Sequence, residues 1–168
     1  MSRSCRSHRL RSFLSAALTG VFAQAVMAGD CAPIVKAINA TLKAPVYRQY
    51  RYFPGRGERL FGIALGDTVY IAIGGSNGWQ KMDRKDNIAI ATRAEEDTAY
   101  RECKWLGSDL VNGVATAVYE YTVDSKGSGA GGLPAKVWIG PDGLLRKQGA
   151  KASTMRYEYD NVKAPIPR

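Results

Sequence analysis

Residues 46–53 read VYRQYRYF, a run in which aromatic side chains are interspersed with arginines. Successive side chains of a strand point to opposite faces, so the even-numbered residues would share one face and the odd-numbered residues the other. Aromatic and β-branched residues in this pattern favour a β-strand. We therefore expect a strand here, followed by a turn at residues 54–57, PGRG.

The flanking segments complete an α+β pattern. Before this strand, Ile34, Val35, Ile38 and Leu42 recur at three-to-four-residue spacing, which predicts a helix over residues 31–43. Residues 86–97 predict a second helix, from a weaker periodicity. The other expected strands span residues 58–65, 68–73, 79–82, 98–106, 113–123, 135–139, 144–149 and 153–162. Short connections between them predict a mainly antiparallel sheet, with a helix available to cover one face.

The first 28 residues predict a cleaved export signal. Four arginines and no acid precede an apolar run at residues 13–27, and the small residues before Gly29 fit a signal-peptidase site. The run is short for a membrane span and has no basic flank after it, so we expect no transmembrane anchor after cleavage. Residues 29–168 are then expected to form a single exported domain, located in the periplasm or, as second choice, secreted.

Composition excludes several classes of catalyst. The chain has 24 Lys and Arg, 15 Asp and Glu, one His and three Cys. Removing the signal takes away four Arg, His8 and Cys5, and leaves 140 residues with a net charge of +5, no histidine and two cysteines. Histidine-dependent catalysis and most zinc or iron sites are excluded. We expect no catalytic residue, metal or cofactor, and a hydrolase that uses carboxylates such as Glu95 or Glu120 is the least favoured alternative.

The two cysteines of the mature chain, Cys31 and Cys103, are expected to form a disulfide. A loop of about 70 residues closed in this way would stabilise the fold by roughly 4 kcal/mol on the chain-entropy model. A redox-active pair is less favoured because the C-x-x-C spacing is absent. Lipidation of Cys31 is also disfavoured, because the charged Asp30 precedes it.

Aromatic residues supply the candidate ligand site. Three tryptophans and nine tyrosines lie in or near the expected strands. In a strongly curved sheet, one face of such residues can line an apolar cavity, while the alternative role is ordinary core packing or cross-strand pairing. The candidate ligand-binding residues are Tyr50, Tyr70, Trp79, Trp105, Tyr119, Tyr121, Trp138 and Tyr157.

The excess of basic residues is spread along the chain. Basic surfaces can bind nucleic acid, so nucleic acid has to be considered as a partner. Export from the cytoplasm argues against that partner, so we expect none. The glycine-rich run at residues 126–132, KGSGAGG, predicts a mobile loop rather than a phosphate site, because no Lys-Ser/Thr pair follows the glycines.

Four short motifs carry a resemblance to a known family. They are GWQK at Gly78–Lys81, VYEY at Val118–Tyr121, KVWIGPDGLLRK at Lys136–Lys147 and YEYDNV at Tyr157–Val162. In this order, after an N-terminal amphipathic helix, they resemble the periplasmic lipoprotein-carrier superfamily, the LolA-like half-barrels. The resemblance implies a strongly curved sheet or half-barrel with the N-terminal helix packed on it.

The same resemblance implies a function. Its members hold acyl chains or another apolar ligand on the concave face, with helices as a lid. We therefore expect a non-enzymatic periplasmic protein that binds a lipid or another apolar small molecule, and an envelope protein is a possible partner. The alternative is a disulfide-stapled secreted interaction or inhibitor domain, which would bind a protein or cell-wall partner through its convex surface or the loop at residues 126–132.

Overall fold

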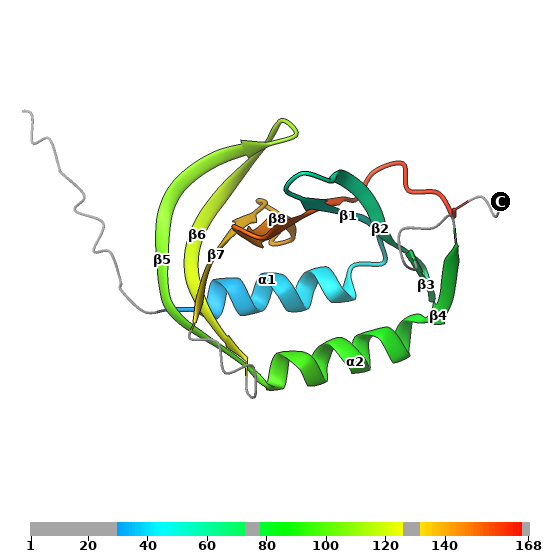
Figure 1. Ribbon diagram of the computed structural model, residues 1–168, viewed down its shortest axis with the longest axis horizontal. Coiled ribbons are helices and arrows are strands. Elements are labelled where there is room, and N and C mark those ends of the chain that lie inside the picture. Colours follow the sequence, from blue (N-terminus) through cyan, green and yellow to red (C-terminus); the bar gives the residue numbers. More distant parts are fainter. Residues whose placement is uncertain (1–29, 73–77, 126–131, 166–168) are drawn as a thin grey trace, which may run out of the picture.

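The computed structural model describes residues 30–72, 78–125 and 132–165 (Figure 1). These residues form two helices, α1 (Ala32–Lys43) and α2 (Arg84–Glu96). The strands are β1 (Val46–Phe53), β2 (Gly57–Leu65), β3 (Thr68–Ala72), β4 (Trp79–Asp83), β5 (Thr98–Val111), β6 (Val114–Ser125), β7 (Leu133–Ile139), β8 (Leu145–Ala150) and β9 (Ser153–Glu158). The expected signal and most of the glycine-rich loop lie outside the described residues and stay predictions.

The nine strands form one antiparallel sheet in the order β4-β3-β2-β1-β9-β8-β7-β6-β5. The last strand of the chain, β9, lies in the middle, between β1 and β8. The two edge strands, β4 and β5, do not pair with each other, so the sheet curves around α1 without closing (Figure 1). The predicted α+β fold, a strongly curved sheet with the N-terminal helix packed on it, is confirmed.

A tight turn joins β7 to β8. The backbone N–H of Gly143 donates to the carbonyl of Gly140 at 3.0 Å, and Gly140 N–H donates to the carbonyl of Leu144 at 2.8 Å. Gly143 has a φ of 76°, which a residue without Cβ adopts at no steric cost.

Two strands end more than two residues away from the position expected from the sequence. Strand β5 runs five residues past Leu106, because two irregularities in its pairing with β6 let a long strand bend with the sheet. They lie between Arg101 and Lys104 and between Trp105 and Gly107. Strand β9 ends at Glu158, short of residue 162, because Asn161 takes a φ of 54° that interrupts the extended backbone.

Helix α1 packs its apolar stripe on the sheet. Ile34, Ala37 and Ile38 are buried in a core that also contains Val137 and Leu145 of the sheet. Such a stripe at helical spacing explains why residues 32–43 fold as a helix in this chain. Thr41, at the end of the stripe, accepts a hydrogen bond from Leu145 N–H at 2.9 Å through its Oγ1.

A disulfide joins the start of α1 to β5. The sulfurs of Cys31 and Cys103 are bonded, and their Cα atoms lie 5.2 Å apart. Cys103 is buried in the same core as α1. The predicted disulfide is confirmed.

Helix α2 is attached mainly through its first residue. Arg84 is the buried residue of this helix, whose other side chains are half-buried or exposed. Its guanidinium donates hydrogen bonds to four backbone carbonyls, those of Leu42, Ala44, Pro45 and Gly66. Since two of these carbonyls lie at the C-terminal end of α1, the charge of Arg84 also complements the helix dipole of α1.

Neither α1 nor α2, the helices of the described segments, has the length and apolar character needed to cross a membrane.

Candidate ligand-binding site

The alternation along β1 divides the sheet into two faces. Tyr47 belongs to the core with α1, and Gln49 is paired with Tyr157, which is also part of that core. We call this the helix-side face. Arg48 and Tyr50, the residues on either side of Gln49 in the strand, point to the opposite face. Directly paired residues share a face, so the register assigns residues of every other strand to one face or the other.

Buried tyrosines dominate the helix-side face. The rings of Tyr47 and Tyr157 meet edge to face with centroids 6.2 Å apart, and the centroids of Tyr100 and Tyr121 are 5.6 Å apart. Burial raises the pKa of Tyr47, Tyr100 and Tyr157, and it raises the pKa of Tyr121 to about 12. These hydroxyls therefore stay protonated at neutral pH and provide ring surface and hydrogen bonds rather than a base.

A cavity of about 190 Å³ lies between this face and the two helices. Aliphatic side chains from both helices form much of its wall. The lining residues are Ile38, Thr41 and Leu42 of α1, Ala91, Ala94 and Glu95 of α2, and Tyr47, Gln49, Leu145, Gln148 and Tyr157 of the sheet. Small alanines on α2 leave the space that larger residues would fill.

Polar groups at one side of this cavity are only partly satisfied. The Gln49 side-chain Nε2 donates to Met155 Sδ at 2.7 Å and to the Tyr157 hydroxyl at 3.3 Å. The neighbouring Gln148 Oε1 is buried and has no hydrogen-bond partner among the described residues. A buried acceptor without a donor is energetically costly, so this end of the cavity is polar while the rest of its wall is mainly apolar.

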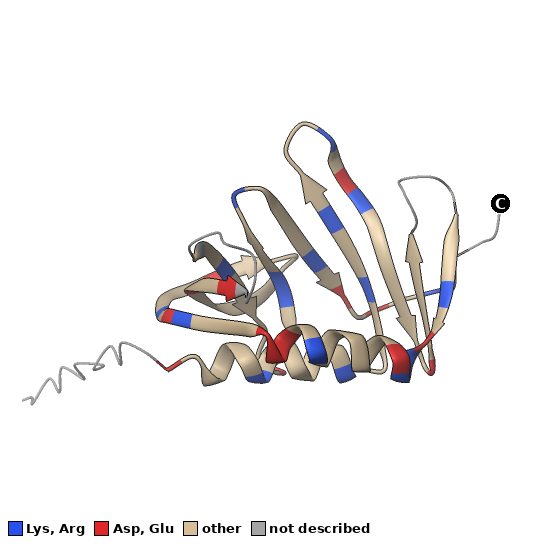
Figure 2. Cartoon of the chain, turned by 60° about the horizontal axis from the view of Figure 1, so that its bottom comes forward, with Lys and Arg blue, Asp and Glu red and all other residues tan. Residues whose placement is uncertain are grey.

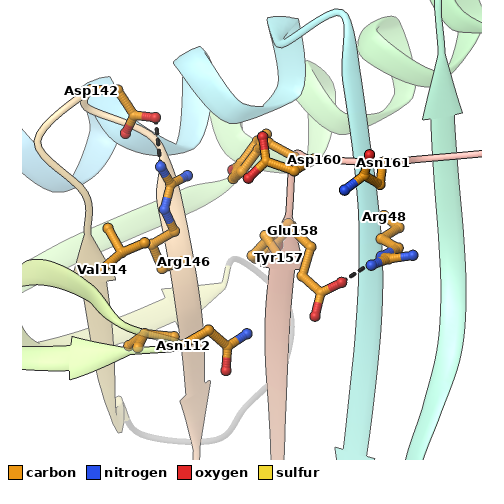
Figure 3. Close-up of a pocket in the computed structure, with 11 residues that line it drawn as sticks. Arg48, Asn112, Val114, Asp142, Arg146, Tyr157, Glu158, Asp160 and Asn161 are labelled. Carbon is orange, nitrogen blue, oxygen red and sulfur yellow. Dashed lines mark hydrogen bonds and ion pairs between the residues drawn. The ribbon is translucent and has the colours of Figure 1, made fainter.

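Larger cavities lie on the opposite face, and their chemistry is polar. The close-up in Figure 3 shows one of about 350 Å³, where the Arg48 side chain points to Glu158 and the Arg146 side chain points to Asp142. The Arg146 and Asp142 side chains meet at 2.6 Å. Asn112, from the turn between β5 and β6, lines the same cavity. Both arginines that line this cavity are thus already paired with carboxylates.

Two further cavities extend along this face, with volumes of about 360 and 420 Å³. Lys147 lines both, and its ammonium lies 4.5 Å from the ring centroid of Trp138. Figure 2 shows that basic and acidic residues are both spread over several strands and over the helices of the described segments. The opposite face therefore has no single sign of charge.

The carboxylates considered for catalysis are both engaged. Glu95 of α2 accepts a hydrogen bond from the Tyr100 hydroxyl, and Glu120 of β6 lies 3.9 Å from the ammonium of Lys136. They come from different sides of the sheet, since Glu95 lines the helix-side cavity and Glu120 lines a cavity of the opposite face. Within the described segments, no group of three His, Cys, Asp or Glu residues could hold a metal ion.

The eight predicted ligand-binding residues are divided between the two faces. Pairing places Trp105, Tyr119, Tyr121 and Tyr157 on the helix-side face. It places Tyr50, Tyr70, Trp79 and Trp138 on the opposite face. Of the first group, Tyr157 lines the helix-side cavity directly; of the second, Trp138 lines a cavity of about 360 Å³.

Gln49, Gln148 and the alanines of α2 were not predicted as site residues. The alternation in VYRQYRYF places Gln49 on the face of Tyr47, which is a usable signal. Nothing comparable marks Ala91 and Ala94, because small residues on a polar helix suggest exposure rather than a cavity wall.

Comparison with known proteins supports the fold alone. No protein-family model and no curated protein matches the sequence. Among solved structures, the crystal structure of the Mycobacterium tuberculosis lipoprotein LppX is similar, with 12% sequence identity and a TM-score of 0.50. The match covers 81% of this chain and 97% of LppX. This chain thus shares the curved, unclosed sheet of LppX at the level of the fold alone.

Proposed function

We propose that the protein is a non-enzymatic binding protein of the bacterial periplasm, and that it holds a lipid or another apolar ligand between its helices and its sheet. The cavity lined by α1, α2 and the buried tyrosines carries this proposal. The similarity in fold to LppX and the expected export signal support it. The disulfide fits an oxidising compartment.

Uptake of a chain-like ligand requires α2 to move. Pockets for small molecules are usually about 300–1,000 Å³, whereas the cavity has about 190 Å³. Since α2 buries little besides Arg84, moving its far end away from the sheet would mainly cost the hydrogen bond from the Tyr100 hydroxyl to Glu95. The cavity would then enlarge at Ala91 and Ala94 while Arg84 keeps the helix attached.

A pair of variants on one helix tests this proposal. Ala91 lines the cavity and Ala89 is exposed on the same helix. Ala91→Phe fills the cavity and is expected to weaken binding of a fluorescent fatty acid at least tenfold, while Ala89→Phe leaves binding unchanged. Unchanged binding by Ala91→Phe, or no uptake by the wild-type protein and no lipid found by mass spectrometry of protein isolated from the periplasm, would contradict the proposal.

A second candidate function uses the opposite face. Tyr52 and Leu110 line the cavity of about 420 Å³, and they are 44% and 68% exposed. Exposed apolar side chains beside a groove are typical of interaction sites, which favours the alternative of an interaction or inhibitor domain. In that case Leu110→Asp would abolish capture of an envelope partner and leave fatty-acid uptake intact, whereas Ala91→Phe would do the reverse.

A further inference from the structure

The arginines of the two faces differ in their partners. On the opposite face, Arg48, Arg146 and Arg156 each form an ion pair with a carboxylate. On the helix-side face, Arg51 of β1 and Arg59 of β2 form none with any residue of the described segments. Both nevertheless lie on the face that surrounds the proposed ligand cavity.

The two unpaired arginines lie directly opposite each other in the pairing of β1 with β2. Like charges at such positions repel each other and destabilise a sheet. A bound anion between them would remove this repulsion. The arrangement is therefore unfavourable in the empty protein and favourable with an anionic group in place.

Arg51 is also held in position. Its guanidinium carbon lies 5.0 Å from the ring centroid of Phe53 and 5.3 Å from that of Phe61. Its Nε is buried and has no hydrogen-bond partner among the residues that the structure describes. Two aromatic contacts orient the planar group, and the unused Nε–H is a donor that a carboxylate or phosphate oxygen would satisfy.

One residue separates this pair from the cavity. Met155 of β9 is paired with Arg51 on one side and with Gln148 on the other. Gln148 lines the cavity, and so does Gln49, which donates to the Met155 sulfur. Neighbouring strands are about 4.8 Å apart, so Arg51 and Gln148 are separated by roughly 10 Å. This distance is within reach of one amphipathic molecule.

We propose that Arg51 and Arg59 bind the anionic head group, a carboxylate or a phosphate, of an amphipathic ligand whose apolar part lies in the cavity between helices and sheet. This inference rests on the proposed function and narrows its ligand class from apolar molecules in general to amphipathic anions. The two phenylalanines orient Arg51, and Arg59 adds a second positive charge.

The test compares a fluorescent fatty acid with its uncharged methyl ester, which has the same chain. The wild-type protein is expected to bind the acid at least tenfold more tightly than the ester, and added salt should narrow this preference. Arg51→Gln and Arg59→Gln should weaken binding of the acid at least fivefold and leave the ester unaffected. Arg51→Lys should retain part of the preference. Arg56→Gln, at the exposed turn of the same hairpin, is the matched control and should leave the preference unchanged.

The outcomes separate this inference from the proposed function. Equal binding of acid and ester by the wild-type protein would overturn the anion site and leave the ligand cavity standing. Failure of both probes to bind would overturn the proposed function itself. Inorganic phosphate should compete with the acid only in the millimolar range, and competition as tight as that of the acid would assign the pair to a free anion instead of a lipid head group.

Stability provides a second readout. Arg59 is exposed, so Arg59→Gln is expected to fold, and loss of the repulsion should raise its melting temperature slightly while the preference for the acid falls. A purely structural arginine would behave in the reverse manner, with a lower melting temperature and an unchanged acid-to-ester ratio.

Discussion

The two faces of this sheet are built from the same strands and differ in their side-chain chemistry. The helix-side face buries tyrosines and aliphatic residues under α1, with their hydroxyls protonated. The opposite face places arginines beside carboxylates, and these ion pairs hold the pKa of Glu58 and Glu158 below the ordinary value. The difference teaches that buried packing is concentrated on one face and ion pairs on the other. Alkali should therefore act mainly on the first and acid on the second.

Alkaline pH should lower the stability most, because tyrosines of the unfolded chain ionise at a lower pH than the tyrosines buried in the folded protein. An unfolded tyrosine loses its proton near pH 10, while burial raises the pKa of Tyr121 and Tyr159 to about 12 and that of Tyr157 further. The contribution of these tyrosines to the free energy of unfolding is complete below pH 10. It is lost as pH rises, by roughly 1.4 kcal/mol for each tyrosine and pH unit. Denaturant unfolding between pH 9 and 11 measures this loss.

The matched variants for this prediction lie on the two faces. Tyr157→Phe should make the loss of stability with pH shallower, whereas Tyr52→Phe, at a side chain 44% exposed on the opposite face, should not change the slope. Equal slopes for all three proteins would mean that buried tyrosines do not control alkaline unfolding.

Removal of the disulfide should rank next. The double variant Cys31→Ser/Cys103→Ser removes a bond between residues that are 72 positions apart in the sequence, so the unfolded chain gains conformational freedom. The expected loss is about 4 kcal/mol in the free energy of unfolding. Reduction of the wild-type protein should give a similar loss in the same denaturant titration. A loss below about 1 kcal/mol would show that the packing of α1 fixes this end of the helix without the covalent bond.

Truncation of one side chain on each face compares the two faces more directly. Ile34 is fully buried on the helix side, so Ile34→Ala should cost about 3 kcal/mol. Leu110 is 68% exposed beside the opposite face, and Leu110→Ala should change stability by less than about 0.5 kcal/mol. Thermal or chemical unfolding of the two variants would contradict the comparison if their losses were equal.

Acid should produce the smallest effect. Hydrogen bonds from Arg156 lower the pKa of Glu58, and those from Arg156 and Arg48 outweigh the effect of burial on Glu158. Stability from these pairs is present above pH 4.5 and is lost as pH falls through the lowered pKa values. Exposed pairs contribute about 0–1 kcal/mol each, so the change should be modest. Glu158→Gln should reduce the acid sensitivity, and Glu96→Gln on the exposed part of α2 should leave it as it is.

The sequence predicted the elements better than the site. Alternation in VYRQYRYF and the spacing of Ile34, Ile38 and Leu42 are local signals, and both elements lie where they were expected. The division of Tyr50 from Tyr157 between two faces depends on which strands pair and in which register. That information is not local. Likewise, Arg84 lies at the start of a polar helix, and only the tertiary structure brings four carbonyls to its guanidinium.

The open sheet has a consequence for self-association. A sheet that stays open has two unpaired strand edges, and such edges can recruit strands from other molecules. Here β4 is five residues long, and β5 is interrupted next to Arg101 and at Gly107, with Lys104 between the two irregularities. Short length, bulges and positive charge all hinder the docking of a foreign strand. The sheet can therefore stay open without presenting a template for aggregation.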